Sequence, residues 1–264
     1  MKMEQAIRPA HDKEQEVAQT LERKIRKAVG KAVGDFGLIE RGDRILVCVS
    51  GGKDSYTLLH VLRLLQERAP IRFELQAVNL DPGYLGFQKE VVKEWVENNG
   101  VKIHMVDAPI REMVEEKFGP NTAGCPLCAR IRRGVFYTLA KKIDCNKLAL
   151  GHHLDDVIET LLLNLFYSGS MRAMPPLLRR NEPPSVIRPL CYVTEKDITD
   201  FASVMGFPVF PCASEHCADS DQRRQVIKGI LSGLEKTHPD LKNQMRHALG
   251  NIDPKFLWDV RLKK

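Results

Sequence analysis

Residues 50–55, with the sequence Ser50-Gly51-Gly52-Lys53-Asp54-Ser55, combine the residue types that bind phosphate. The glycines allow a tight turn and expose backbone N–H groups, while the serine hydroxyls and the Lys53 ammonium add donors and positive charge. An apolar run at 44–50 precedes the segment and a helical pattern at 54–68 follows it, so the positive end of a helix dipole would face the anion. The spacing is not that of a Walker A loop. We therefore expect a nucleotide-binding loop of another kind rather than a plain tight turn, and name residues 50–55 the phosphate loop.

Polar residues also lie at the ends of two other predicted strands. Asn79 and Asp81 end a run that begins at 73, and the sequence Gly151-His152-His153-Leu154-Asp155-Asp156 follows a run at 147–151. In parallel sheets the carboxyl ends of the strands meet at one edge, where ligands bind. Mg²⁺ is held by a carboxylate or two together with phosphate oxygens, which makes Asp155 a candidate magnesium ligand. The alternatives are helix caps for the carboxylates and ordinary polar positions for the histidines.

These positions give a predicted set of site residues. ATP is expected to contact the whole phosphate loop together with Asn79, Asp81, Gly151 and His152. Catalytic roles are assigned to Lys53, Asp54 and Asp155.

Strand-like and helical patterns alternate along most of the chain. The strand-like runs lie at 44–50, 73–79, 102–106 and 147–151, and the helical patterns at 54–68, 87–99, 109–118, 126–142 and 154–167. Continuous apolar runs of this kind suit strands that are buried on both faces. The alternation predicts βαβ crossovers, and hence an α/β fold with a doubly wound parallel sheet and helices on both faces.

Helical additions are expected at both ends of the chain. At 13–34, one apolar stripe lies opposite a face rich in Lys and Arg; that face is expected to be solvated, with an RNA-facing arm as the alternative. A loop rich in Pro and Arg is predicted at 171–190, a helix at 194–205, a short strand at 207–210, and further helices at 222–236 and 241–249. The predicted domains are an N-terminal helical arm (1–36), a nucleotide-binding α/β domain (37–211) and a C-terminal helical tail (212–264).

The composition excludes some classes of protein. The 264 residues carry a net charge of +6, which permits a polyanionic partner such as RNA but does not require one. No stretch approaches the ~18 consecutive apolar residues of a membrane-spanning helix. The first residues also lack the apolar segment of a secretory signal. A cytoplasmic protein that does not enter a membrane is therefore expected.

The seven cysteines favour metal or redox chemistry over disulfide bonds, because their number is odd. Cys125 and Cys128 have the two-residue spacing that directs both sulfurs at one metal ion or cluster. A structural zinc half-site and a redox-active dithiol are the alternatives; the only candidates for a second zinc-binding pair, Cys212 and Cys217, are separated by four residues rather than two. Buried, structural positions are predicted for the remaining three, Cys48, Cys145 and Cys191.

Several segments together resemble a known family. The phosphate loop is similar to the Ser-Gly-Gly-x-Asp-Ser signature of the PP-loop ATP pyrophosphatases. With the phosphate loop, five further segments make residues 38–231 resemble the tRNA 2-thiocytidine synthetases: 125–134, 151–160, 164–176, 187–190 and 195–198. The resemblance implies a PP-loop sheet of the adenine nucleotide alpha hydrolase (HUP) type, and cleavage of ATP to AMP and pyrophosphate.

The resemblance further implies that the enzyme adenylates O2 of the cytidine at position 32, in the tRNA anticodon loop, and replaces that oxygen with sulfur. It implies a [4Fe-4S] cluster on three cysteines, whose open iron holds sulfur from a cysteine desulfurase or from sulfide. Cys125 and Cys128 would be two of the ligands. The family pattern is altered around the third, for which Cys217 is preferred and Cys212 is the alternative. ATP, Mg²⁺ and tRNA complete the implied ligands, and a homodimer is expected.

Three rival functions remain open at this point. A tRNA 2-thiouridine synthetase would carry extra zinc-binding cysteine pairs near both ends, and neither the first 47 nor the last 47 residues contain a close pair. A lysidine synthetase would have no use for Cys125 and Cys128. A non-catalytic nucleotide- or metal-binding regulator would leave ATP uncleaved when tRNA is added.

Overall fold

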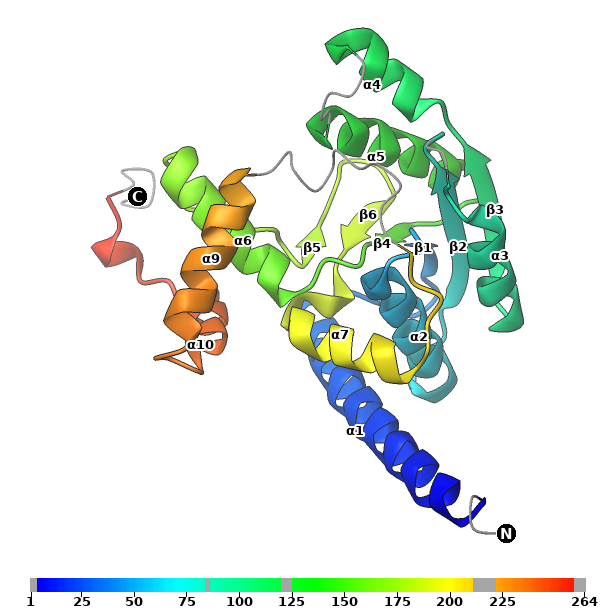
Figure 1. Ribbon diagram of the computed structural model, residues 1–264. Helices are drawn as coiled ribbons and strands as arrows, with labels where there is room; N and C mark the ends of the chain where they lie inside the picture. The colour runs from blue at the N-terminus through cyan, green and yellow to red at the C-terminus, as the bar shows by residue number, and fades with distance from the viewer. Residues whose placement is uncertain (1–3, 84–85, 120–124, 211–221, 259–264) are drawn as a thin grey trace. The chain divides into compact units, whose positions relative to one another are not determined.

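The computed structural model describes residues 4–83, 86–119, 125–210 and 222–258. Its α-helices are α1 (Glu4–Phe36), α2 (Lys53–Arg68), α3 (Lys89–Asn98), α4 (Ile110–Phe118), α5 (Cys125–Lys142), α6 (Leu154–Tyr167), α7 (Glu195–Val204), α9 (Gln222–Glu235) and α10 (Leu241–Leu249). Its strands are β1 (Arg44–Cys48), β2 (Glu74–Asp81), β3 (Lys102–Asp107), β4 (Lys147–Ala149), β5 (Leu177–Leu178) and β6 (Ser185–Ile187). Two 3₁₀ helices are η1 (Pro189–Tyr192) and η2 (Pro254–Phe256) (Figure 1).

The strands form a six-stranded sheet in the order β3-β2-β1-β4-β6-β5 (Figure 1). Neighbouring strands are parallel except β5 and β6, which are antiparallel. In the central strand β1, Val47 pairs with Ala77 of β2 on one side and with Ala149 of β4 on the other. The chain moves outward from β1 through β2 to β3 and then returns to β4, so its direction reverses between β1 and β4. The predicted doubly wound parallel sheet is confirmed.

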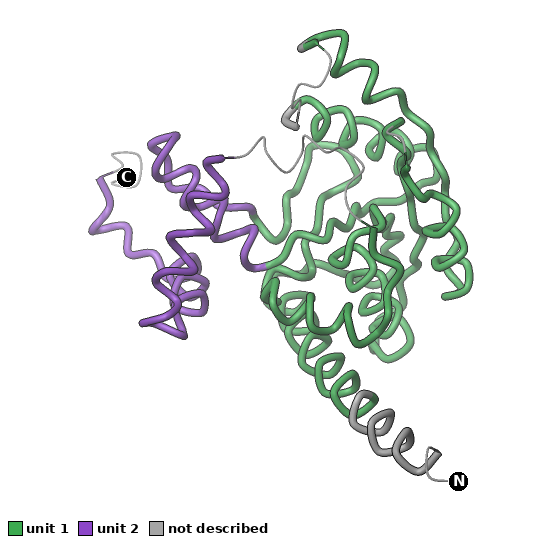
Figure 2. Tube along the Cα trace, viewed as in Figure 1, with its two compact units in different colours: residues 1–153, 175–221 green, residues 154–174, 222–264 purple. Residues whose placement is uncertain are grey.

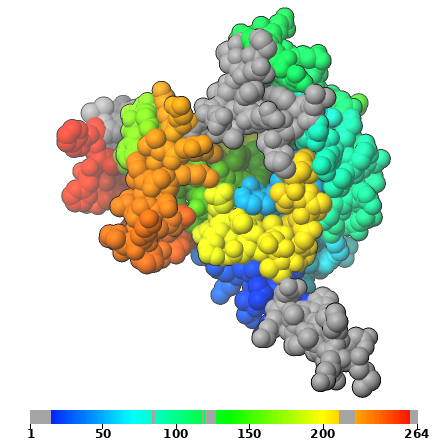
Figure 3. Space-filling model, in the orientation of Figure 1, coloured from blue at the N-terminus to red at the C-terminus, as the bar shows by residue number. Residues whose placement is uncertain are grey.

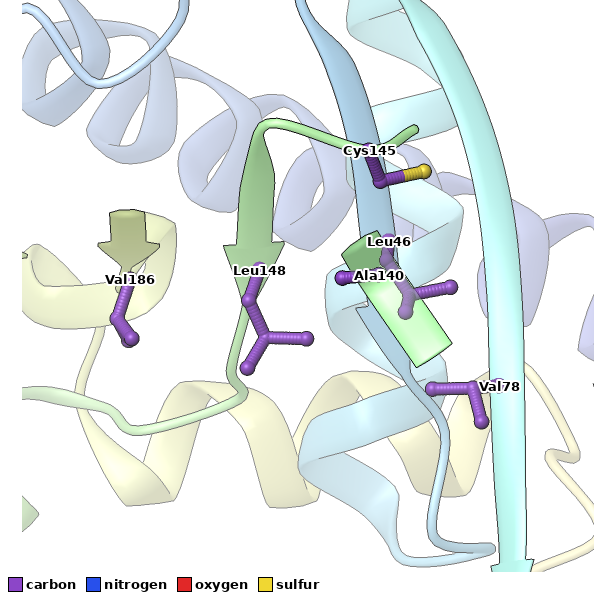
Figure 4. Packing of buried hydrophobic residues seen from close by; sticks show 6 residues of the cluster. All are labelled: Leu46, Val78, Ala140, Cys145, Leu148 and Val186. Atoms are coloured by element: carbon purple, nitrogen blue, oxygen red, sulfur yellow. The ribbon is translucent and has the colours of Figure 1, made fainter. Parts of the chain in front are cut away.

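Helix α5 covers one face of this sheet. Leu46, Val78, Leu148 and Val186, from four neighbouring strands, form a buried cluster with Ala140 of α5 (Figure 4). The strands alternate, so Ile45 and Val47 of β1 point to the opposite face and are also fully buried. This burial on both faces explains why β1 is a continuous apolar run rather than an alternating one.

Helices α2, α3 and α7 are joined by an aromatic cluster on the opposite face. The Tyr56 ring of α2 lies 4.6 Å from the Trp95 ring of α3, and the Phe207 ring, just after α7, lies 5.4 Å from Trp95 and 5.7 Å from Phe201. Helix α1 packs on α2, α7 and η1 and buries Ile25 and Ala32 of the predicted apolar stripe together with Val29, whereas Val17 of the stripe is exposed. The N-terminal helix is therefore confirmed, and it begins at Glu4, earlier than predicted.

The chain divides into two compact units (Figure 2). Unit 1 comprises residues 1–153 and 175–221 and holds the sheet, whereas unit 2 comprises residues 154–174 and 222–264. In unit 2, Leu154 and Ile158 of α6 form a buried cluster with Ile227 and Leu231 of α9. The predicted helices α9 and α10 are thus present, and α6 packs with them. The domain boundaries at 36/37 and 211/212 stay a prediction.

Two local predictions are wrong. The predicted strand at 207–210 is absent, because the segment packs its Phe207 ring among the aromatic side chains of α2, α3 and α7 instead of pairing with the sheet. The predicted loop at 171–190 contains β5, β6 and η1. These strands are two and three residues long, too short for an apolar pattern to form among the prolines.

None of the helices in the described ranges combines the length and the apolar composition needed to cross a membrane.

Candidate active site

The phosphate loop lies at the point where the direction of the sheet reverses. It follows β1, while Gly151 and His153 follow β4, the parallel neighbour of β1. Ligands of doubly wound sheets bind in the crevice at the carboxyl ends of the strands, at this topological switch point. On the face drawn in Figure 3, blue atoms from the start of α2 are visible in a hollow bordered by the yellow atoms of α7. The expectation that these two strand ends share one edge is confirmed.

Hydrogen bonds within the phosphate loop hold it in shape. The Ser55 hydroxyl donates to the carbonyl oxygen of Gly52 over 2.8 Å and accepts from the backbone N–H of Ser50 over 3.1 Å. The N–H of Gly52 donates to the Ser50 hydroxyl over 3.4 Å. Gly52 is also the N-cap of α2, and no side chain caps it. The free helix N-terminus keeps its N–H groups and its positive dipole end available for an anion.

Gly51 has two reasons to be glycine. Its φ of +87° is in the region that glycine adopts most readily, and a Cβ there would lie 2.2 Å from the Phe210 ring. The backbone N–H of Phe210 also donates to the Gly51 carbonyl oxygen over 3.4 Å. Phe210, the last described residue before segment 211–221, therefore lies against the phosphate loop. Phe210 was not among the predicted site residues, because no local sequence pattern indicates a contact between residues 51 and 210.

Lys53 lies between two carboxylates. Its Nζ is 3.0 Å from Asp54 Oδ1 and 3.3 Å from Glu195 Oε1, at the first residue of α7. Burial alone would lower the pKa of Lys53, but the two carboxylates outweigh it and raise the pKa above its ordinary value. Lys53 is therefore a cation at neutral pH. Glu195 was not predicted as a site residue, although it opens one of the segments that carry the family resemblance.

Gly151 allows β4 to approach the first turn of α2. A Cβ on Gly151 would lie 3.2 Å from the backbone carbon of Asp54 and 3.3 Å from its oxygen, closer than side chains normally pack. The buried His153 places its Nε2 3.9 Å from Asp54 Oδ1. The structure thus brings His153 against the loop, and the ATP contact predicted for His152 stays a prediction. His152 accepts a hydrogen bond through Nδ1 from Arg188 Nε, over 3.3 Å.

Asn79 connects β2 to the end of β1. Its Nδ2 donates to the carbonyl oxygen of Val49 over 2.8 Å, and the whole side chain is buried. Its Oδ1 is buried and has no hydrogen-bond partner within the described part of the chain. A buried acceptor without a donor is costly, so this oxygen fits a ligand group that donates. Asp81 instead accepts from the N–H of Gly83 over 2.9 Å and pairs with Lys89 at 3.4 Å.

Asp155 lies in unit 2, where Lys242 of α10 pairs with it. The Lys242 Nζ is 2.7 Å from Asp155 Oδ1 and 3.0 Å from Glu235 Oε1. Burial would lower the pKa of Lys242, but these two carboxylates raise it overall. Asp156 pairs with Arg224 of α9 at 3.4 Å. The acidic first turn of α6 is thus neutralised by cations of α9 and α10, and its predicted magnesium role stays a prediction.

The structure describes one of the predicted cluster cysteines in full. Cys128 is half-buried in the first turns of α5 and packs against a cluster that contains Leu80, near the carboxyl end of β2. It therefore lies at the same edge of the sheet as the phosphate loop. The side chain of Cys125, and the whole of Cys212 and Cys217, fall outside the described residues. Among the residues that are described, no three His, Cys, Asp or Glu side chains are grouped as a metal site would require.

The other cysteines have the structural positions that were predicted. Cys145 and Cys191 are buried, and Cys48 packs at the border of the cluster in Figure 4. Burial raises the pKa of the Cys145 thiol to about 11. It also raises the pKa of Cys48, so both thiols stay protonated and unreactive at neutral pH.

Comparisons with known proteins agree with this geometry. The PP-loop domain family matches residues 17–228. A protein of Geobacter sulfurreducens named tRNA-cytidine(32) 2-sulfurtransferase is 49% identical over 92% of this chain and 95% of its own length. A protein of the same name from Syntrophotalea carbinolica is 49% identical over 94% of this chain and 96% of its own length.

Solved structures with a similar fold include a tRNA-modifying protein. It is the U34-tRNA thiolase NcsA from Methanococcus maripaludis with its [4Fe-4S] cluster, which aligns with a TM-score of 0.72 at 21% identity. The alignment covers 89% of this chain and 82% of that one. At this identity the likeness establishes the fold alone.

Proposed function

We infer the activity from the family to which the chain belongs, the PP-loop domain proteins that are tRNA-cytidine(32) 2-sulfurtransferases. The chain is a tRNA sulfurtransferase, which uses ATP to replace O2 of a cytidine in the anticodon loop with sulfur. The observation that carries this conclusion is the phosphate loop at the switch point of the sheet, braced by its own serines and approached closely by Gly151. An anticodon loop presents the target base unpaired, so little energy is needed to unstack it.

The residues of the loop fit ATP as the activating substrate. The N–H of Gly51 and the N-terminus of α2 bind phosphate oxygens, and Lys53 supplies a positive charge beside them. The orphaned Oδ1 of Asn79 accepts a hydrogen bond from the nucleotide. Asp54 orients Lys53 and contacts His153 on the side of β4. Asp81 and His152, each with partners of its own, line the outer part of the site.

The reaction consists of two displacements. O2 of the cytidine attacks the α-phosphorus of ATP, and the bond to pyrophosphate breaks. Lys53 and the α2 N-terminus stabilise the negative charge that develops on the phosphate oxygens. A sulfur nucleophile then attacks C2 of the activated base, and AMP leaves with the former O2. Both leaving groups are phosphate anions, so the same positive groups, Lys53 and the α2 N-terminus, can stabilise the leaving group in both steps.

A [4Fe-4S] cluster fits the cysteine donors of this chain. Cys128 is half-buried at the carboxyl edge of the sheet, and Cys125 precedes it by one helical turn at the start of α5. Cys217 is the third ligand, with Cys212 as the alternative. A cluster held by these three thiolates would supply the sulfur that enters the base, as catalytic metals keep a position for a reacting group. The sulfur comes from a cysteine desulfurase or from sulfide.

Three further assignments complete the proposal. Asp155 binds Mg²⁺ with the phosphates of ATP, which requires Lys242 to give up its ion pair. The chain forms a homodimer, which is supported by an apolar stripe on α9 where Val226, Ile230 and Leu234 are exposed at four-residue steps. The enzyme acts in the cytoplasm, where tRNA is modified.

Two experiments test these assignments. Nucleosides of tRNA from cells with and without the gene are compared by mass spectrometry, and an unchanged level of 2-thiocytidine would reject the substrate. In the second, Cys212→Ala and Cys217→Ala are purified without oxygen and analysed for iron and sulfide. We expect Cys217→Ala to lose the iron and the visible absorbance while Cys212→Ala keeps both; the reverse result assigns Cys212 as the ligand.

A further inference from the structure

A second cavity lies at the other edge of the sheet. It has a volume of about 730 Å³, within the ~300–1,000 Å³ range of ligand sites. The wall includes α1, the C-terminal end of α2 and the residues that lead into β2. Helix α2 has 16 residues and is about 24 Å long, and the phosphate loop lies at its other end. The cavity is therefore separate from the candidate active site.

The charged residues that line this cavity are all cations. Arg23, Arg26 and Lys27 come from α1 and Arg68 from α2, while Ile39, Leu65, Ile71 and Phe73 give an apolar floor. No acidic side chain lines the cavity. The Nη1 atom of Arg26 is buried and has no hydrogen-bond partner in the described ranges. An anion with an apolar or aromatic ring would neutralise the cations, satisfy this donor and cover the floor.

Two glycines keep the cavity open. Gly30 and Gly34 lie one turn apart inside α1 and both line the wall. A Cβ at either position would meet nothing within 4 Å, and neither residue has a positive φ, so neither packing nor backbone conformation requires glycine. Glycine inside a helix lowers its stability relative to alanine. The physical effect of both glycines is to leave room beside Arg26.

We propose that this cavity, which we name the basic cavity, binds an unpaired nucleotide of the tRNA substrate at a distance from the target cytidine. The base covers the apolar floor, one phosphate meets Arg26, and neighbouring phosphates meet the exposed rim of Arg23, Lys27 and Arg68. A rim spread over two helices suits a continuous backbone better than the single phosphate of a free nucleotide. A folded RNA can span the length of α2 and reach both sites. This inference rests on the proposed function.

Two variants test this proposal: one fills the cavity without removing charge, and the other removes a charge that lines it. In Gly30→Leu, a good helix former projects into the cavity, so the thermal melting temperature should be unchanged or higher. Arg26→Gln removes the buried donor. Both variants should bind full-length tRNA about tenfold more weakly at fixed ionic strength, by fluorescence anisotropy. Arg26→Gln should also lower the slope of log affinity against log salt by about one.

Lys31→Gln is the matched control. It removes one positive charge from the same helix, but Lys31 is exposed, pairs with Asp35 and does not line the cavity. We expect less than about a twofold change in tRNA affinity for this variant. ATP binding should equal that of the wild type in all three variants.

The outcomes separate this proposal from the proposed function. If wild-type protein binds tRNA and releases AMP, but Gly30→Leu and Arg26→Gln bind tRNA equally well, the basic cavity is not an RNA site and the proposed function stands. If the wild type binds no tRNA, both proposals fail. Titration with free 5′-CMP and 5′-AMP forms a second arm. Loss of free-nucleotide binding in the variants, with tRNA binding unchanged, would assign the cavity to a free nucleotide and overturn the RNA assignment.

Discussion

Lys53 and Lys242 each lie between two carboxylates, and each of these lysines belongs to a different compact unit. Lys53 contacts Asp54 and Glu195, whose side chains are 34% and 35% exposed. Lys242 contacts Asp155, which is 7% exposed, and Glu235, which is 33% exposed. The charges are alike, but only the second triad contains a buried carboxylate. The difference predicts that Lys242 mainly stabilises its unit, whereas Lys53 is available to a ligand.

The largest change in stability is expected when the charge of Lys242 is removed. Lys242→Met removes the cation 2.7 Å from the buried Asp155 carboxylate, which should lower the free energy of unfolding by about 3–5 kcal/mol. Chemical denaturation measures this loss. The control is Lys236→Met, an exposed lysine in the turn after α9, which should change stability by less than about 0.5 kcal/mol. Equal stability of the two variants would contradict the inference that Lys242, unlike Lys53, mainly stabilises its unit.

Lys53→Met should show the opposite pattern to Lys242→Met, with a small loss of stability and a large loss of activity. The carboxylates that it leaves are about one-third exposed and can be solvated, so we expect less than about 1 kcal/mol of destabilisation. Loss of a charge beside the reacting phosphates should lower kcat/KM about 10²–10³-fold. Release of pyrophosphate from ATP in the presence of tRNA measures the rate. A variant that unfolds easily but keeps full activity would assign Lys53 to structure instead.

The surroundings of Lys53 illustrate how far the sequence predicts the site. The phosphate loop is contiguous, so its turn, its dipole and its position after a buried strand can all be read from residues 44–68. The βαβ alternation then predicts that Asn79 and Gly151 lie at the same edge, because parallel strands place their carboxyl ends together.

Contacts between distant residues could not be predicted. Glu195 and Phe210 reach the loop from far along the chain, and no periodic pattern marks either contact. The catalytic and magnesium-binding roles predicted for Asp155 likewise took no account of Lys242, because an ion pair between α6 and α10 depends on how unit 2 packs. The strand pattern also does not show which of the neighbouring His152 and His153 turns toward Asp54, and the structure places His153 there.

Smaller effects are expected when the glutamate beside each lysine, Glu195 beside Lys53 or Glu235 beside Lys242, loses its charge. Glu195→Gln and Glu235→Gln each remove a partner of similar exposure, so each should cost less than about 1 kcal/mol of stability. Glu195→Gln should also tighten ATP binding about two- to fivefold, because less negative charge competes with phosphate for Lys53. Isothermal titration with ATP checks this. Glu235→Gln should leave ATP affinity unchanged; weaker ATP binding in Glu195→Gln would mean that Glu195 itself supports the nucleotide.

The smallest effect is a dependence of stability on alkaline pH. The pKa of Lys242 is raised in the folded chain, since Asp155 and Glu235 outweigh the effect of burial. The folded state therefore holds this proton more tightly than the unfolded state. The stabilisation is fully present below the unfolded pKa of about 10.4 and is lost as the pH rises through the higher folded value. Melting of the wild type and Lys242→Met between about pH 8 and 11.5 should show two curves that begin to approach each other above about pH 10.4, by at most about 1.4 kcal/mol per pH unit. A difference that stays constant over this range would show that Lys242 stabilises unit 2 through the packing of its methylene groups, and the contrast with Lys53 would then be one of burial rather than of charge.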